Sequence, residues 1–290
     1  MCEWCFKHGA GGKWYLNAKN YSDELAKELD LEDYLTEQWR NFENVFIRKI
    51  MGFSSVGLGY KLQMPVIGKA FRYAAEGMIH SESHNRNAIR ADGHFGQVIP
   101  AEDAKIILSE LAPDDSIIQN YCMCRMMQKG IKDACCINFG VLSGVIEKLP
   151  RFIPENTKYR LDHEEAVEQV EIQTEKGRIP TVWFQPVPYI NAVCFCETPQ
   201  CGGLRLRTDF GLNALYKGEY VIEADPDNCQ GCKKCIPYCQ FGALNYSPTL
   251  NRVLVDQDKC FGCGLCRQAC NFDALELKPR EEFSLQKDNF

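Results

Sequence analysis

Two runs of four cysteines in the last quarter of the sequence constrain this chain more than any other feature. The cysteines are Cys229, Cys232, Cys235 and Cys239 in the first run, and Cys260, Cys263, Cys266 and Cys270 in the second. Both runs have the spacing C-x2-C-x2-C-x3-C, and the flanking residues repeat with the same offset. Examples of these flanks are Asp225, Phe241 and Ala243, which correspond to Asp256, Phe272 and Ala274. Since chance does not reproduce eight cysteines with their flanks, we interpret the segment as a duplicated metal-binding unit.

The spacing within each run suits a [4Fe–4S] cubane. Such a cluster needs four thiolates, and cysteines three positions apart in a tight loop can bind three of its corners. The fourth cysteine of each run is far enough along the chain to reach the other cluster. We therefore predict two crossed ligand sets: Cys229, Cys232, Cys235 and Cys270, and Cys260, Cys263, Cys266 and Cys239. Zinc is the alternative, although zinc usually takes two C-x2-C pairs rather than four cysteines in one run.

Residues 219–277 resemble the bacterial dicluster ferredoxins. The resemblance implies two short β-hairpins and two short helices around two clusters, and a function in electron transfer. The segment departs from the family after each fourth cysteine, where Gln240 and Asn271 replace the usual proline. Each replacement restores a backbone N–H. We expect this donor to lie near a cluster sulfur and to raise the reduction potential.

Length and composition bound the rest of the molecule. We expect an α+β fold with a helical N-terminal region over residues 1–97, a small cysteine-rich α/β domain over 98–218, and the dicluster module with a tail over 219–290. The formal charge is −6, and thiolate-bound clusters add negative charge, so we expect no nucleic-acid partner. No export signal and no transmembrane segment is recognised. Seventeen cysteines then indicate metal chemistry in a reducing cytoplasm.

Seven further cysteines lie in the middle of the chain: Cys122, Cys124, Cys135, Cys136, Cys194, Cys196 and Cys201. The pattern predicts helices over 101–111 and 162–174 and strands over 116–121, 181–185 and 190–195. Because residues two apart on a strand share a face, each C-x-C pair can point at one site.

We predict that this region holds a third metal centre, either a third [4Fe–4S] cluster or another metal site. The predicted ligands are Cys124, Cys136, Cys194 and Cys196, followed by Cys122 and Cys201. The alternative is that some of these are buried free cysteines that pack as small hydrophobes. Arg125 is either a donor to a cluster sulfur or an ordinary surface arginine.

The middle region also resembles anaerobic iron–sulfur proteins that carry a C-x-C-R domain upstream of a dicluster ferredoxin. The residues that carry the resemblance are Cys122-Met123-Cys124-Arg125, Cys136-Ile137-Asn138-Phe139-Gly140 and Cys194-Phe195-Cys196. Near the start of the chain, Cys2, Cys5 and His8 are either half of a zinc or cluster site or a loose terminal pair. The segment from Cys2 to Leu16 resembles the opening of the same family.

The N-terminal third contains an unusual basic stretch. Residues 22–49 predict one or two amphipathic helices, and residues 44–75 contain no acidic residue. This acid-free stretch is also apolar and rich in glycine. It is suited to docking on a partner subunit or, less favourably, to peripheral association with a membrane surface. Packing over its own core is the alternative.

No nucleotide-binding signature, nucleophile elbow or zinc-protease pair is present. We therefore predict an electron-relay subunit of a larger anaerobic, cytoplasmic oxidoreductase complex. Its partner would be a catalytic redox subunit or another electron-transfer protein. The alternatives are an autonomous iron–sulfur oxidoreductase and a redox-sensing regulatory protein.

Overall fold

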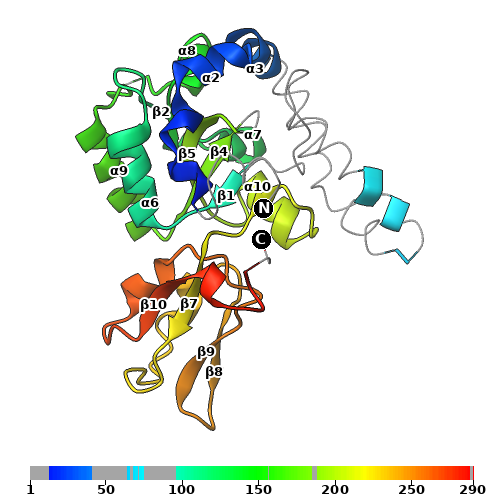
Figure 1. Ribbon diagram of the computed structural model, residues 1–290, viewed down its shortest axis with the longest axis vertical. Coiled ribbons are helices and arrows are strands. Elements are labelled where there is room, and N and C mark those ends of the chain that lie inside the picture. Colours follow the sequence, from blue (N-terminus) through cyan, green and yellow to red (C-terminus); the bar gives the residue numbers. More distant parts are fainter. Residues whose placement is uncertain are drawn as a thin grey trace.

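The computed structural model describes residues 13–40, 64–65, 68–70, 72–74, 96–155, 157–184, 188–287 and 290. Figure 1 shows a helix-covered sheet in one part of the molecule and a small C-terminal module below it. The described residues form both helices and strands, so the predicted α+β fold class is confirmed, with its cysteine-rich middle region and ferredoxin-like module.

A six-stranded sheet forms the centre of the middle region. Its strands, in spatial order, are β2 (Ile118–Tyr121), β3 (Ala134–Asn138), β5 (Ile190–Cys196), β4 (Ile179–Phe184), β1 (Gly96–Val98) and β6 (Leu215–Tyr216). Neighbouring strands are antiparallel except β1 and β6, which are parallel. The predicted strands over 116–121 and 190–195 are found as β2 and β5.

Strand β4 begins two residues earlier than predicted. The predicted strand starts after Pro180, whereas β4 includes Pro180, which pairs with Phe195 on β5. Proline is tolerated near a strand start, where its missing N–H matters least. Its carbonyl still accepts a hydrogen bond from the Ile99 amide, at 3.1 Å.

Helices on one face of the sheet are α6 (Ala101–Ile106), its π-helical continuation η4 (Ile107–Leu111) and α9 (His163–Glu175) (Figure 1). Both predicted helices of this region are confirmed. Helix α9 begins with a capping box, in which Asp162 accepts from the Glu165 amide and Glu165 accepts from the Asp162 amide. This local signal fixes the helix start because it satisfies two backbone donors that have no partner inside the helix.

The other face is covered by α2 (Asp23–Glu28), α3 (Leu31–Arg40) and α8 (Val141–Glu147) (Figure 1). The short helices η1 (Trp14–Leu16) and η2 (Ala18–Tyr21) precede them, and η5 (Pro150–Phe152) follows α8. Trp14 and Tyr15 are completely buried, and their side chains donate to Gln97 and Asp103. The described part of the predicted region 1–97 therefore shares its core with the sheet.

The C-terminal module is built from two small antiparallel pairs of strands. β8 (Leu244–Ser247) and β9 (Arg252–Val255) form a hairpin, whereas β7 (Tyr220–Ala224) pairs with β10 (Leu275–Pro279). The second pair brings together the two ends of the module, so it is not the second hairpin that the resemblance implied. The short helices are the 3-10 turns η6 (Ile236–Tyr238) and η7 (Leu265–Ala269), and η8 (Arg280–Glu282) follows β10.

The module is fastened to the sheet by several polar contacts. Arg267 and Glu102 form an ion pair at 2.6 Å, and the Lys217 ammonium donates to the Asp258 carbonyl at 2.7 Å. Gly218 connects the two parts, and its amide donates to the Phe261 carbonyl at 2.8 Å. A Cβ at this position would lie 2.6 Å from the Val98 carbonyl oxygen, so the close approach requires glycine.

Two predictions from the N-terminal third fall largely outside the described residues. Cys2, Cys5 and His8 lie there, as do most residues of the acid-free stretch 44–75. An exception in that stretch is Arg72, whose guanidinium donates to the carbonyls of Phe210 and Gly211. Within the described ranges, no helix is long and apolar enough to cross a membrane.

Candidate metal centres

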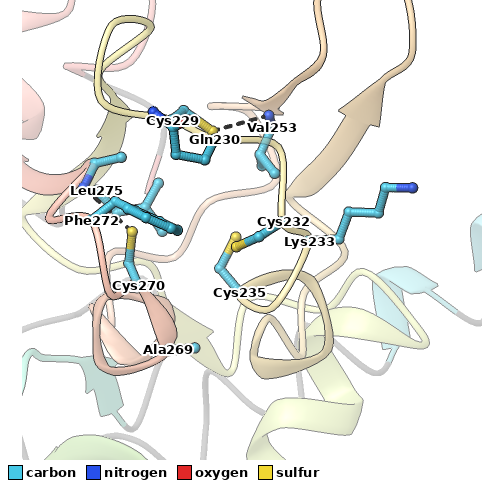
Figure 2. Close-up of a pocket in the computed structure, with 11 residues that line it drawn as sticks. Cys229, Gln230, Cys232, Lys233, Cys235, Val253, Ala269, Cys270, Phe272 and Leu275 are labelled. Carbon is cyan, nitrogen blue, oxygen red and sulfur yellow. Dashed lines mark hydrogen bonds between the residues drawn. The ribbon is translucent and has the colours of Figure 1, made fainter.

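The eight cysteines of the module surround two small cavities of similar size. The first, which we call the outer cavity, is lined by Cys229, Cys232, Cys235 and Cys270 (Figure 2). The second, the inner cavity, is lined by Cys239, Cys260, Cys263 and Cys266. Each cavity thus takes three cysteines from one run and one from the other.

Backbone amides donate to four of these sulfurs in a pattern that follows the sequence repeat. The donors to Cys229 and Cys260 are Val253 and Ile222, each at 3.4 Å. The donors to Cys239 and Cys270 are Ala243 and Ala274, each at 3.3 Å. Hydrogen bonds of this kind stabilise thiolates and the additional electron of a reduced cluster. The donated bonds at Cys239 and Cys270 therefore come from the alanines. That the Gln240 and Asn271 amides lie near a cluster sulfur stays a prediction.

Without a metal, the module's buried thiols tend to keep their protons. A bound metal ion compensates the negative charge of the thiolates and so displaces those protons. Burial raises the pKa of Cys235 to about 11 and that of Cys263 to about 12, although a backbone hydrogen bond lowers each in part. A metal ion deprotonates a coordinating thiol outright. The cysteine-only donor set, the cavity shapes and the N–H···S bonds together fit two thiolate-bound clusters.

The two cavities differ in their surroundings. Cys232 is exposed at the outer cavity, and the neighbouring Phe272 is 45% exposed. The inner cavity lies beside two buried cations: Arg280 is completely buried and Lys217 nearly so. Arg280 donates to the carbonyls of Gly218, Tyr220 and Cys260.

Both cations are affected by their burial. Burial, and after it the charges of Arg280 and Arg207, lower the pKa of Lys217 to about 8. Burial also lowers the pKa of Arg280 to about 10, against the opposing attraction of Cys260, so this guanidinium is protonated at neutral pH. The inner cavity therefore has two buried cations beside it, whereas Lys233, which lines the outer cavity, is exposed.

An apolar layer joins the inner cavity to the middle region. Phe241 and Phe261 stack with ring centroids 4.0 Å apart, and both line the inner cavity. The same hydrophobic cluster includes Cys263 of the module and Cys196 and Cys201 of the middle region. The inner cavity and the middle-region cysteines are therefore separated by packed side chains.

Gln240 bridges the two parts of the chain. Its side-chain oxygen accepts from the Thr198 amide at 2.8 Å, and its side-chain nitrogen donates to the Gly177 carbonyl at 2.7 Å. The residue that replaces proline after the first run thus connects the module to the loops after α9 and β5. The sequence singled out this position through the missing proline and its backbone N–H, but it gave no sign of the contacts that the side chain makes.

The structure brings the seven middle-region cysteines together, and we call them the thiol group. They come from the end of β2, from the first turn of α7 (Met123–Lys129), from β3, from β5 and from the loop before α10 (Gly202–Thr208). Contacts link Cys122 to Cys124, Cys124 to Cys201, and Cys136 to both Cys122 and Cys194. The sulfurs of Cys196 and Cys201 are 3.1 Å apart. All six cysteines predicted for this site thus lie in one group.

Cys135, which the sequence analysis left out, is also a member of the group. Its sulfur and those of Cys122 and Cys136 all lie within 4.8 Å of one another. Adjacent residues on a regular strand point to opposite faces. Here the β2–β3 register shifts, so that Asn120 pairs with Cys136 and Tyr121 with Ala134. Cys135 is the extra residue of this bulge, and a bulge can re-aim a side chain in this way.

Within the thiol group, Cys122 is the preferred thiolate. Hydrogen bonds from Cys124, Cys135 and Cys136 hold the pKa of Cys122 well below its ordinary value. The pKa values of these three neighbours are raised, first because each shares its proton with Cys122. For Cys194, the hydrogen bond with Cys136 lowers the pKa, but burial together with the negative charges of neighbouring sulfurs raises it to about 12. Cys122 is therefore the member of the thiol group whose surroundings most favour the thiolate.

Arg125 is buried beside this group, so it is not the ordinary surface arginine that the sequence left open as an alternative. It lies on α7 (Met123–Lys129), is 3% exposed, and pairs with Asp133 and Glu197. Burial lowers its pKa, but the combined attraction of the neighbouring cysteine sulfurs, Glu197 and Asp133 outweighs burial and raises it. Arg178 also pairs with Asp133. These ion pairs fix a cation next to the thiols, where it can stabilise negative sulfur.

Comparison with known proteins identifies the C-terminal module. The curated proteins gave no match to the chain. Residues 228–274 match the family model of the 4Fe-4S dicluster domain, and this range contains all eight cysteines of the two runs. The C-terminal part of the chain is therefore a 4Fe-4S dicluster module of the ferredoxin type, which binds iron–sulfur clusters and has a role in electron transfer.

Proposed function

We propose that the protein is an electron-relay subunit of a larger oxidoreductase complex. Two [4Fe–4S] clusters would be held by the crossed cysteine sets of the outer and inner cavities, and the thiol group would hold a third metal centre. A [4Fe–4S] cluster takes up and releases one electron. The chain holds the centres close together, keeps water from the inner ones and sets their relative potentials through hydrogen bonds and charge.

The observation that carries this proposal is the asymmetry between the two cavities. Cys232 and Phe272 give the outer cavity an exposed side, where a redox partner can approach. The inner cavity is covered by the middle region, and its wall residues Phe241 and Phe261 belong to the hydrophobic cluster that contains Cys196 and Cys201. An exposed site followed by a covered one is the arrangement expected of a relay.

The charges favour electron flow toward the interior. Arg280 and Lys217 stabilise an additional negative charge at the inner cavity more than at the outer one. The inner cluster should therefore have the higher potential. An electron that enters at the outer cavity then moves inward, and the partner at the exposed side is an electron donor, either a catalytic redox subunit or another electron-transfer protein.

The experiment is a reductive titration of anaerobically purified protein, followed by electron paramagnetic resonance and by iron and sulfide analysis. We expect at least eight iron and eight sulfide per chain. Two interacting cluster signals should appear one after the other as reductant is added. The signal that appears first should be the one that is lost when an inner-cavity cysteine is replaced. Protein that contains zinc but no sulfide would contradict the relay, as would clusters that do not exchange electrons.

The matched pair of variants is Phe272→Ala at the outer cavity and Leu285→Ala in the tail, since Leu285 is also exposed, at 88%. With the complex that co-purifies with the chain, Phe272→Ala should slow reduction by the partner, and Leu285→Ala should not. Equal rates in both variants would place the partner at another surface.

A further inference from the structure

The thiol group differs from the two module sites in the spacing of its sulfurs. Cys122, Cys135 and Cys136 have sulfurs within 4.8 Å of one another. The eight module cysteines all lie in the described part of the chain, and no three of them approach this closely. They surround open cavities instead. One chain therefore contains two different arrangements of thiols.

The close spacing matches the geometry of a single metal ion. Four thiolates at about 2.3 Å from a tetrahedral ion have sulfurs about 3.8 Å apart. In a cubane, each thiolate binds a different iron at a different corner, so the ligand sulfurs stand farther apart. A group that lies within 4.8 Å can close on one ion by small side-chain rotations, whereas a cubane would require the sulfurs to separate.

The sheet holds two of these thiols side by side. Cys136 on β3 pairs directly with Cys194 on β5. The position of β5 is fixed by its pairing with β3 on one side and with β4 on the other. Residues directly opposite in an antiparallel pair have Cβ atoms about 4.5–5.5 Å apart. The bulge at Cys135 brings a second β3 thiol to the same place, and Cys122 approaches from the end of β2. Cys194, which contacts Cys136, completes a set of four.

We propose that Cys122, Cys135, Cys136 and Cys194 bind one tetrahedral thiolate-preferring ion, zinc or iron(II), in place of a third cubane. This inference rests on the third metal centre of the proposed function but assigns it different ligands. Cys135 is a ligand, and Cys124, Cys196 and Cys201 are not. Arg125, held by Asp133 and Glu197, lies beside the site as a fixed positive charge. Binding of the ion releases the remaining thiol protons, because only the thiolate is a ligand.

The test counts sulfide and metal in the anaerobically purified full-length chain. We expect about eight sulfide and eight cluster iron, plus one further ion. Elemental analysis distinguishes the two metals, since it gives either one zinc per chain or a ninth iron. A ninth iron should have the Mössbauer signature of a single iron(II) in four thiolates. For zinc, absorption spectroscopy at its edge should give four sulfur neighbours at about 2.3 Å. About twelve iron and twelve sulfide would establish a third cubane and overturn the proposal.

A matched pair of substitutions separates the two ligand sets. Cys135→Ser should remove the single ion without loss of sulfide, and Cys196→Ser should retain both. A third cubane on the sequence-predicted cysteines requires the reverse, with four sulfide lost in Cys196→Ser and none in Cys135→Ser. The sulfide count of the unaltered protein decides the matter even where a variant does not fold. Failure of the relay would appear separately, as absent cluster signals in a protein that still holds its single ion.

Discussion

The cysteines of the dicluster module and those of the thiol group are organised in opposite ways. In the module, the cysteines lie on loops and short 3-10 turns, and they surround cavities. In the thiol group, Cys136 and Cys194 lie on paired strands, and the register of the sheet brings them together. Loop spacing along the sequence therefore sets the geometry of the module, whereas strand pairing sets that of the thiol group.

The two regions also differ in what stabilises them. The core of the module includes the ligands Cys235, Cys260 and Cys266, so much of its interior depends on bound metal. The core under α6 and α9 consists mainly of aliphatic and aromatic side chains, among them Trp14, Phe184 and Phe195. Such a core retains its hydrophobic stabilisation without metal.

The largest expected effect is that of iron removal. Anaerobic chelation of iron should abolish hydrogen-exchange protection in β7, β8, β9 and β10, because these strands surround clusters rather than a side-chain core. Strands β4 and β5 of the central sheet should remain protected. Hydrogen exchange followed by mass spectrometry measures both regions in one sample. Equal loss of protection in the sheet would show that the two regions unfold as a single unit.

The next effect is the loss of one cluster. Cys239→Ala should remove the cluster at the inner cavity, which is otherwise lined by second-run cysteines, and reduce the iron content by about four of eight. Cys270→Ala is the matched variant and should remove the outer cluster. Iron and sulfide analysis with paramagnetic resonance identifies which signal is lost. If Cys239→Ala instead removes the outer signal, each run binds its own cluster and the crossed assignment is wrong.

A smaller effect is expected on reduction potential. Lys217→Met removes a buried positive charge beside the inner cavity and should lower the potential of that cluster by on the order of 50 mV. The substitution Lys233→Met, at an exposed lysine that lines the outer cavity, should shift the outer potential much less because water screens the charge. Redox titration of both variants measures the difference. An unchanged inner potential in Lys217→Met would remove the electrostatic basis for inward electron flow.

The same lysine predicts a pH dependence. Because the pKa of Lys217 is lowered to about 8, the residue loses its charge as the pH rises through this region. The protonated form stabilises the reduced cluster, so the inner potential should be higher below pH 8 and fall above it, by at most about 59 mV per pH unit. The Lys217→Met variant should lack this slope. A slope that persists in the variant would assign the titration to another group.

The smallest effect concerns the contact between the two regions. Gln240→Pro restores the usual proline and removes the side-chain bonds to Thr198 and Gly177. Each lost hydrogen bond should cost about 0.5–1.5 kcal/mol of stability, with iron content unchanged. Asn271→Pro makes the equivalent change in the second run and should leave this contact intact. Thermal unfolding distinguishes them, and an equal effect in both variants would mean that Gln240 does not stabilise the contact.

Local patterns in the sequence determined much of this protein. The cysteine spacing and the 31-residue repeat predicted the dicluster module, because its geometry is set by short loops. Asp162 and Glu165 predicted the start of α9, because a capping box involves only neighbouring residues. The sequence also singled out the C-x-C pairs of the middle region, since alternation on a strand is a local property.

Tertiary structure decided the features that depend on distant residues. The inclusion of Cys135 in the thiol group depends on a bulge between β2 and β3, and a register shift leaves no sign in local spacing. The burial of Arg125 depends on Glu197, which is far away in the sequence, and the bridging role of Gln240 depends on Thr198 and Gly177. Sequence thus determined which residues can bind metal. Strand pairing decided how closely they approach, because the hydrogen bonds of the sheet, not the spacing along the chain, set those distances.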